Sequence, residues 1–328
     1  MSNDFHIDVI GSGNYSSVIK LVFEQRDTAV KCIKSYCDRI SPPVTSEKLE
    51  HVSREERRDM ETELFMLTTP ILKELTWQWR PHFFASLEII DLCRDDSKRI
   101  CDAIGFIPVK MLFMEQLECT FTDLIMKTMS RKASLIFRLF CDIFEILIHL
   151  YRKGIRHNDL MLRNVMVRRK KVKESRSRIL SLKTTPRCNF EWQSDDEYEI
   201  VFIDFGLASV NKSKSKMHNP LVANHDFRDA LYCKKRNGFS LLQGVHPLEL
   251  KNSPYSRVMI DLQCLAFNIQ NLSLNDKCCH KLKNWAKQVF STIYNTQKQA
   301  DLQKRIVDFE VVIGTILPPI AKKFIVDE

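Results

Sequence analysis

The chain has little glycine, and its beginning lacks the marks of a secretory route. Only 8 of its 328 residues are glycine, which argues against flexible linkers between separate domains. The first residues lack the basic and apolar regions of a signal peptide, and no apolar run is long enough to cross a bilayer. We therefore expect an intracellular protein, in the cytoplasm or the nucleus, that does not contact a membrane.

The cysteines also lack a regular pattern. Eleven are present, but without a secretory context or regular spacing they predict reduced thiols and not a disulfide framework. The adjacent residues Cys278 and Cys279, followed by His280, lack the ligand spacing of a usual zinc site. We interpret these three as ordinary packing residues.

Two short segments carry the strongest functional signal. The first, residues 157–164, contains Asp159 and, five residues later, Asn164; the second is an Asp-Phe-Gly sequence that begins at Asp204 after a strand-like apolar run. Phosphoryl transfer from a metal nucleotide needs one carboxylate to orient the attacking hydroxyl, and an amide oxygen and a second carboxylate to hold magnesium. The two segments in this order predict a kinase that uses ATP and Mg²⁺.

A glycine-rich turn lies near the N-terminus. Gly11, Ser12 and Gly13 lie between residues 8–10 and 19–23, two mainly apolar segments that predict the strands of a hairpin. Residues without a Cβ leave room for backbone N–H groups to approach phosphates. We expect this turn to bind the phosphates of the nucleotide.

Lys31 follows the turn, within the strand-like run of residues 28–33. Its position matches the strand that carries the phosphate-binding lysine of kinases. Such a lysine needs an acidic partner from a helix, which holds it against the α- and β-phosphates. Lys31 is therefore a candidate catalytic residue.

Residues 53–69 predict the helix that supplies this partner. Apolar residues recur on one face at spacings of four and three, namely Met60, Leu64 and Leu67. The acidic candidates are Glu55, Glu56, Glu61 and Glu63. Glu63 is favoured because Met66 and Leu67, three and four residues later, turn its face toward the core.

These motifs, in this order, resemble the eukaryotic-type protein kinases over nearly the whole chain. The resemblance implies a single kinase domain with an α+β, bilobal fold and ATP in the cleft between two lobes. The N-lobe, residues 1–116, would hold a small antiparallel sheet with one helix, and the C-lobe, residues 117–328, would be mainly helical. A chain of 328 residues leaves little for an accessory domain.

The same resemblance assigns residues around the adenine base. Met114 takes the gatekeeper position, and the backbone groups of Glu115 and Leu117 would meet adenine. Three apolar residues resemble those that enclose the base on both faces: Val18, Ala29 and Met166.

Two helices of the expected C-lobe have identifiable signals. Residues 133–152 form a strongly apolar run that ends before Gly154, a candidate helix terminator. A later helix resembles the one whose Asp, here Asp261, braces the catalytic loop. Twelve residues earlier, Glu249 matches the glutamate that ends the activation segment, and Arg305 is a candidate for its ion pair.

Three residues of the catalytic loop bear on regulation and specificity. Asn158 replaces the arginine that commonly pairs with a phosphorylated activation segment, so activity is not expected to need phosphorylation between Gly206 and Glu249. Met161 stands where serine/threonine kinases usually carry lysine. Arg163 stands where many tyrosine kinases carry arginine, although a plain surface side chain explains it equally well. Serine/threonine specificity is favoured because the activation segment lacks a tyrosine-kinase ending.

An unusually long insertion, about residues 168–199, separates the catalytic loop from Asp204. It opens with the basic run 168–173 and closes with the acidic run 195–199, which predicts a mobile surface loop. Its place resembles haspin-like kinases. We interpret the basic run as a solvated hairpin end and not as a nuclear localisation signal. The diverged signatures would suit an enzyme of a large DNA virus acting in its host cell.

The expected partner is a protein substrate. The formal net charge of +9 suits an ATP enzyme that meets acidic protein surfaces. It is also compatible with association with nucleic acid, which is not predicted.

Two other functions stay open. Residues 157–164 also resemble the motif of choline kinases and aminoglycoside phosphotransferases, but those enzymes usually lack glycine after Asp-Phe and a clear glycine-rich turn followed by Ala-Val-Lys. A catalytically silent scaffold with a kinase fold is the third hypothesis. Competent residues at the metal, phosphate and base positions argue against it.

Overall fold

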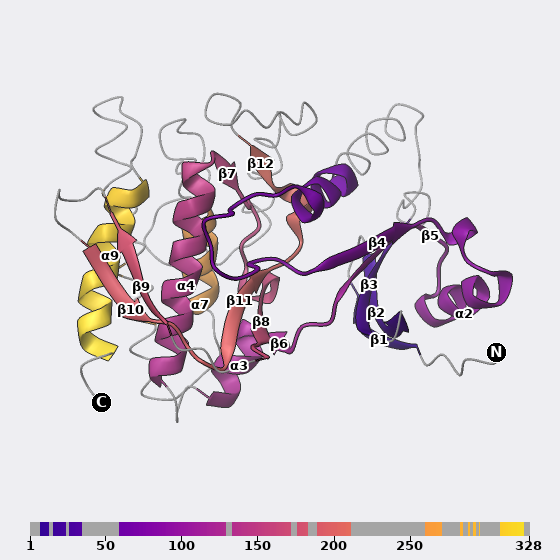
Figure 1. The fold of residues 1–328 in the computed structure, drawn as a ribbon, viewed down its shortest axis with the longest axis horizontal. Helices are drawn as coiled ribbons and strands as arrows, with labels where there is room; N and C mark the ends of the chain where they lie inside the picture. Colours follow the sequence, from indigo (N-terminus) through magenta and orange to yellow (C-terminus); the bar gives the residue numbers. More distant parts are fainter. Residues whose placement is uncertain are drawn as a thin grey trace. The chain divides into compact units, whose positions relative to one another are not determined.

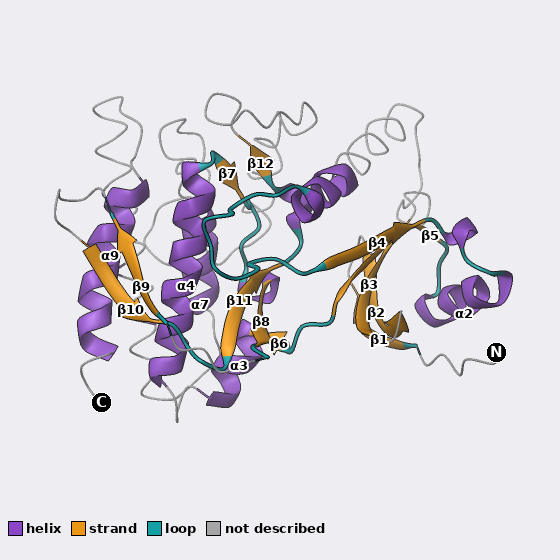
Figure 2. Ribbon diagram, viewed as in Figure 1, coloured by secondary structure: helices purple, strands orange, loops and turns teal. Residues whose placement is uncertain are grey.

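The computed structural model describes residues 7–12, 16–23, 26–34, 59–128, 133–171, 176–182, 189–210, 260–270 and 309–324, together with residues 283, 284, 288, 291, 292 and 295. Within them the chain is α+β with antiparallel sheets, as predicted (Figures 1 and 2). It divides into two compact units. Unit 1 comprises Met1–Pro70 and Arg80–Leu117, and unit 2 comprises Ile71–Trp79 and Glu118–Glu328.

Unit 1 is built on a five-stranded antiparallel sheet in the order β1-β2-β3-β5-β4. Its strands are β1 (Asp8–Ser12), β2 (Ser16–Phe23), β3 (Arg26–Lys34), β4 (Phe83–Leu87) and β5 (Pro108–Glu115). The predicted hairpin is confirmed as β1 and β2. The register shifts between Val9 and Gly11, so the glycine-rich end of β1 begins at an irregularity of the ladder.

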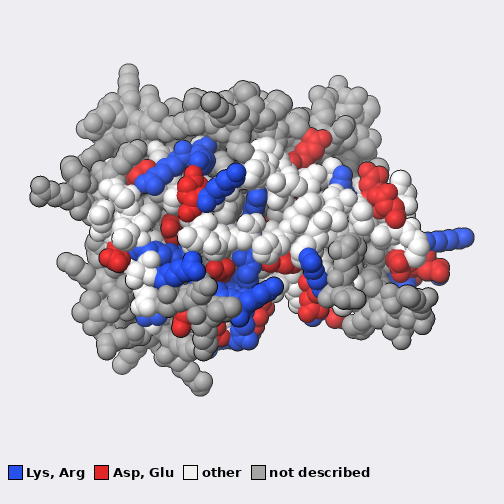
Figure 3. Space-filling model, viewed as in Figure 1, with Lys and Arg blue, Asp and Glu red and all other residues white. Residues whose placement is uncertain are grey.

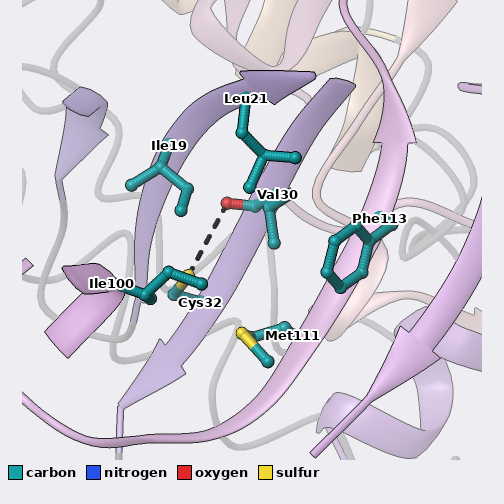
Figure 4. Packing of buried hydrophobic residues seen from close by; sticks show 7 residues of the cluster. All are labelled: Ile19, Leu21, Val30, Cys32, Ile100, Met111 and Phe113. Carbon is teal, nitrogen blue, oxygen red and sulfur yellow. Dashed lines mark hydrogen bonds between the residues drawn. The ribbon is translucent and has the colours of Figure 1, made fainter. Parts of the chain in front are cut away.

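One face of this sheet carries an apolar core that helix α2 (Arg94–Ile104) covers. Figure 4 shows the core side chains Ile19, Leu21, Val30, Cys32, Ile100, Met111 and Phe113. Ile100 is the only buried residue of α2. A helix with one buried residue has no repeating apolar pattern in its sequence, so the sequence does not predict it. The expectation of a single helix within residues 1–116 is therefore wrong.

The helix predicted over residues 53–69 is described from residue 59 to residue 68. Its buried side chains are Thr62, Glu63, Met66 and Leu67. Met60 and Leu64 are only half-buried, so the buried stripe is displaced from the predicted apolar face. Glu63 is buried on the same side as Met66 and Leu67, as predicted for the partner of Lys31.

Arg80 closes the end of this helix. Its guanidinium donates to the carbonyl of Met66 and, at 2.5 Å, to that of Thr69. The last carbonyl groups of a helix have no partner within it, and a buried cation at this end meets that need. Arg80 is 6% exposed, and burial lowers its pKa.

Unit 2 contains the helices α3 (Phe121–Thr128), α4 (Ala133–Arg152), α7 (Ile260–Gln270) and α9 (Phe309–Phe324). α4 has the predicted bounds, and Gly154 follows it at φ 73° with its N–H 2.8 Å from the carbonyl of Tyr151. α9 lies beside α4 (Figure 1). Arg152 joins them by donating twice, at 3.1 and 3.0 Å, to the buried carboxylate of Glu310.

Short strands of unit 2 frame the loop 157–164. β6 (Cys119–Thr120), β8 (Val165–Arg169) and β11 (Tyr198–Phe202) form a three-stranded sheet in the order β11-β8-β6. β7 (Ile155–Arg156) pairs with β12 (Ser209–Val210). The loop therefore lies between β7 and β8 in sequence, and each of these strands pairs with a segment flanking Asp204.

The prediction of a mobile loop over residues 168–199 is wrong for the described part. β9 (Ser177–Ser181) and β10 (Asn189–Gln193) form an antiparallel hairpin. Its inward side chains are buried, namely Leu180, Phe190 and Trp192. In β10 the buried Phe190 and Trp192 alternate with polar residues, as a half-buried strand requires. In β9 the residue before Leu180 is the exposed Ile179, and charged runs lie on either side of the hairpin, so the sequence obscures the pattern. The runs themselves pair across β8 and β11, with Arg169 2.9 Å from Glu197.

No helix in the part of the chain that the structure describes is long and apolar enough to cross a bilayer.

We expect Arg80→Met to lower the free energy of unfolding by about 2 kcal/mol, because two carbonyl groups lose a charged donor. Urea denaturation followed by circular dichroism measures this loss. Arg94→Met is the matched control, since Arg94 is exposed at the start of α2, and its change should stay within about 0.5 kcal/mol. Equal losses in the two variants would contradict the helix-closing role of Arg80.

Candidate functional site

Lys31 and Glu63 form a buried ion pair in unit 1. Nζ of Lys31 lies 2.5 Å from Oε2 of Glu63, and the two side chains are 14% and 6% exposed. Neighbouring residues of a strand point to opposite faces, so Lys31 points away from the core that contains Val30 and Cys32. A buried charge needs a partner, and here each residue holds the other in place.

The glycine-rich turn is described up to Ser12. A Cβ placed on Gly11 would lie 3.8 Å from Cβ of Val18, which is ordinary van der Waals contact. Packing within the described residues therefore does not demand glycine at this position. Ser12 and Ser17 lie within hydrogen-bond distance, with 3.2 Å between their Oγ atoms.

The residues assigned to the base are divided between the units. In unit 1, Ala29 lies opposite Met114 in the β3–β5 ladder, and both are half-buried, as are Val18 and Leu117. The N–H of Glu115 donates to the carbonyl of His82 at 2.9 Å. Met166, also half-buried, belongs to β8 in unit 2.

Asp159 and Asn164 are joined directly in unit 2. Nδ2 of Asn164 donates to the carbonyl oxygen of Asp159 at 2.8 Å and to its Oδ2 at 3.0 Å. The 3₁₀ turn Leu162–Asn164 closes the loop and brings the two residues together. Both are buried. The amide nitrogen of Asn164 is engaged by Asp159, so its amide oxygen is the atom suited to bind a cation.

The backbone of Asp204 is in the left-handed region, at φ 63° and ψ 64°. Asp is one of the few residues besides glycine that are enriched there. The preceding residue, Ile203, donates its N–H to the carbonyl oxygen of Asn164 at 3.0 Å. Asp204 and Asn164, the two predicted metal ligands, therefore lie on backbone segments that are hydrogen-bonded to each other.

Asp261 fixes the loop that carries Asp159. Its Oδ2 accepts the backbone N–H of His157 at 2.8 Å, and its Oδ1 accepts that of Asn158 at 2.7 Å. Burial raises the pKa of the Asp261 carboxyl, while His157 and the two N–H groups act in the opposite direction. The two bonds match the bracing role that the resemblance implies for this residue.

His157 and Asn158 in turn reach the Asp-Phe-Gly segment. Nδ2 of Asn158 donates to the carbonyl of Leu207 at 2.8 Å, and Nε2 of His157 lies 2.9 Å from the carbonyl oxygen of Ile203. Asn158 has a φ of 65°, a conformation that Asn adopts more readily than most residues. The residue that departs from the kinase pattern thus has a structural role of its own.

Trp79 is a site residue that the sequence reasoning missed. Its ring stands edge-on to Phe205, with 5.5 Å between ring centres, and to Phe202, with 6.5 Å. Its carbonyl accepts the N–H of Phe202 at 2.8 Å. The one available signal is the pair of tryptophans, Trp77 and Trp79, in a short segment that follows Pro70.

Arg163 and Met161 occupy opposite environments. Arg163 is 59% exposed, and its Nη2 lies 3.9 Å from Oδ2 of Asp159. Met161 is buried. Some predictions concern residues outside the described ones, namely Gly13, Glu55, Glu56, Glu249, Cys278, Cys279, His280 and Arg305.

In comparisons with known proteins, no family model matches this chain. None of the curated proteins gives a significant match either.

We expect Asp261→Asn to lower the free energy of unfolding by about 2 kcal/mol, because a buried carboxylate that accepts two N–H groups gains an amide donor in place of one acceptor. Urea denaturation at neutral pH measures this. Asp196→Asn is the matched control, since Asp196 is exposed in the same unit and the change should cost less than about 0.5 kcal/mol. The bracing role fails if the two variants are equally stable.

Proposed function

We propose that this protein is an ATP-dependent protein kinase that transfers the γ-phosphate to protein hydroxyls, with serine and threonine favoured. The observation that carries the proposal is the arrangement of Asp159, Asn164 and Asp204. The side-chain amide of Asn164 donates to the Asp159 carboxylate, and the backbone carbonyl of Asn164 accepts the N–H of Ile203, the residue before Asp204. Phosphoryl transfer to a hydroxyl requires one carboxylate that orients the hydroxyl, here Asp159, and oxygen ligands for a cation, here from Asn164 and Asp204.

Asp159 would orient the substrate hydroxyl and accept its proton. The amide of Asn164 fixes one carboxylate oxygen, so the carboxylate is oriented before any substrate arrives. In unit 1, Lys31 would contact the α- and β-phosphates, and Glu63 holds its ammonium group. Asp159 and Lys31 therefore each have a partner that fixes the position of the side chain.

Mg²⁺, when bound, would neutralise the charge of the β- and γ-phosphates. The Asn164 amide and the Asp204 carboxylate offer the hard oxygen atoms that this ion prefers. The hydrogen bond from Ile203 to Asn164 keeps the two ligand-bearing segments adjacent. The residues present therefore fit the ion.

Further observations support the proposal. Gly11 is not needed for packing among the described residues, which leaves close approach of a ligand as a reason for glycine there. Unit 1 ends at Leu117, next to the predicted lobe boundary, and contains an antiparallel sheet with a Glu-bearing helix. A bilobal kinase fold, with an N-lobe of residues 1–116 and a C-lobe of residues 117–328, belongs to this proposal.

The location and partners follow from the proposed chemistry. An enzyme that uses ATP and carries reduced thiols would work in the cytoplasm or the nucleus. On the face shown in Figure 3, basic and acidic side chains of the described residues are interspersed. Nucleic acid stays outside the proposal, and a protein is the proposed substrate.

We expect Lys31→Ala, Asp159→Ala and Asp204→Ala each to reduce phosphoryl transfer by at least about 100-fold, because each removes a group that contacts phosphate, hydroxyl or metal. The assay uses purified protein, magnesium and γ-labelled ATP with a protein mixture, and separately with choline or an aminoglycoside. Lys34→Ala is the control on the same strand, and it should retain activity because Lys34 lies over the Phe106 ring.

The outcomes separate the hypotheses. Label in protein supports the proposal, and phosphoamino-acid analysis then distinguishes serine and threonine from tyrosine. Label only in a small molecule indicates a small-molecule kinase, and no label from folded protein indicates a scaffold. Full activity of Asp204→Ala would refute the site assignment.

We also expect that complete phosphatase treatment leaves the activity unchanged. Asn158 carries no charge that could pair with a phosphate, and its amide already binds the carbonyl of Leu207. Mass spectrometry confirms the removal of phosphate from residues 206–249, and the same transfer assay is then repeated. Loss of activity that returns on rephosphorylation would show that an activating phosphate is needed.

A further inference from the structure

Arg178, on the inserted β9–β10 hairpin, is buried although its charge is permanent. Its side chain is 9% exposed, and its Nη1 lies 3.3 Å from Oδ1 of Asp142 and 3.4 Å from Oε2 of Glu145. From the other strand of the hairpin, Trp192 donates Nε1–H to Oδ1 of Asp142 at 3.1 Å. Asp142 and Glu145 are three residues apart on α4, so one face of that helix binds both strands of the hairpin.

The guanidinium of Arg178 also stacks on Trp77. Its central carbon lies 3.6 Å from the ring centre, which places a desolvated cation on an aromatic face. Trp77 belongs to the segment Ile71–Trp79, which is part of unit 2. The edge of the planar guanidinium thus faces the carboxyl groups of Asp142 and Glu145, and its flat face lies on the indole ring of Trp77.

The segment Ile71–Trp79 is fastened along β11 and β8. Nε1 of Trp77 donates to the carbonyl of Ile200 at 3.2 Å, and the N–H of Phe202 donates to the carbonyl of Trp79 at 2.8 Å. Nη1 of Arg168 donates to the carbonyl of Gln78 at 2.5 Å. These bonds hold the ring of Trp79 edge-on to Phe205, the residue after Asp204.

A continuous series of contacts therefore runs from the hairpin to the Asp-Phe-Gly segment, entirely within unit 2. We propose that Arg178 is a positioning residue for Asp204, which acts by holding Trp77 and, through it, the segment that packs against Phe205. The inserted hairpin is then an internal brace of the site. The effect of this brace on catalysis rests on the proposed kinase function. The coupling between Arg178 and the packing of Phe205 does not depend on that function.

The electrostatics of the cluster give this coupling a pH signature. Burial raises the pKa of Asp142 to about 6 and that of Glu145 to about 7, while the cation of Arg178 opposes both shifts. Lys170, after β8, and Glu199 of β11 also act on Asp142. As the pH rises through about 6 to 7, the two carboxyl groups lose their protons and their attraction for Arg178 strengthens.

The stability of the fold changes in the opposite sense over the same range. Both folded-state pKa values lie above the ordinary ones, so the folded protein retains these protons to higher pH than the unfolded chain does. The contribution of the two protons to stability is complete only below their ordinary pKa values of 3.8 and 4.5, and it is lost as the pH rises through about 7. As the pH rises, a stronger attraction between Arg178 and the two carboxylates should therefore accompany a lower free energy of unfolding. A general loosening of the fold would weaken both.

Hydrogen exchange tests the coupling without any assumption about activity. In Arg178→Gln we expect the amides of Phe202 and Ala208 to exchange at least about tenfold faster at pH 7.5, because the segment next to Phe205 loses its anchor. Arg169→Gln is the matched control, since it removes the same charge from an exposed pair on β8 and should leave both rates unchanged. In the wild type, both rates, corrected for intrinsic exchange, should fall between pH 5.5 and pH 7.5.

Kinase assays test the consequence for Asp204. The magnesium concentration for half-maximal activity should rise by about fivefold in Arg178→Gln, with the KM for the protein substrate unchanged, because the metal ligand and not the protein-binding surface is displaced. Arg178→Lys should be intermediate in both measurements, since it keeps the charge but not the planar stack on Trp77. This variant carries the same test if Arg178→Gln does not fold.

The outcomes are distinguishable. Unchanged exchange at Phe202 and Ala208 in both Arg178 variants overturns the coupling, whatever the activity. Faster exchange with an unchanged magnesium requirement overturns the positioning of Asp204. Faster exchange in a protein whose wild type transfers no phosphate supports the coupling and refutes the proposed function alone.

Discussion

The buried carboxylate of Asp261 is the interaction on which the candidate site depends. α7 brings it to a loop that lies 104 residues earlier in the chain, where it accepts the N–H groups of His157 and Asn158. These bonds stabilise the turn in which Asn158 is left-handed, and from that turn both side chains reach the Asp-Phe-Gly segment. One carboxylate thus fixes the backbone conformation of the loop at residues 157 and 158. The side chains of these two residues in turn bond to the backbone on either side of the Asp-Phe-Gly sequence. Because a buried acceptor without its donors is costly, the arrangement resists partial disruption.

Parts of the fold and site with local signals could be predicted from the sequence. The apolar run of residues 133–152 has a helical period and a terminating Gly154, so its bounds agree with α4. Glu63 could be chosen as the partner of Lys31 because its helical phase follows from the apolar residues after it. Asn164 lies beside Asp159 because a spacing of five residues closes a short loop.

The remainder depends on contacts between distant segments, for which sequence carries no local signal. The sequence of α2 is mostly polar, and Ile100 is its one buried residue. The apolar surface that α2 covers is formed by side chains of the sheet, which are distant in sequence. Trp77 bonds to Ile200, 123 residues further along the chain, so its role depends on tertiary packing. In the inserted hairpin, the charges that suggest a solvated loop neutralise one another across β8 and β11, and Arg178 is buried against α4. A charged side chain is expected at the surface only when water is its partner, because a partner within the protein allows it to be buried.

The covering of the sheet by α2 has a consequence for chemical reactivity. Cys32 directly follows Lys31 in β3, but its side chain lies in the core on the opposite face, against Ile100. Burial raises the pKa of its thiol to about 12, so almost none of it is the thiolate that reacts with electrophiles. A covalent reagent that enters beside the candidate phosphate-binding lysine therefore meets an amine, and Cys32 offers it no reactive sulfur, whereas Cys93, before α2, is exposed to solvent.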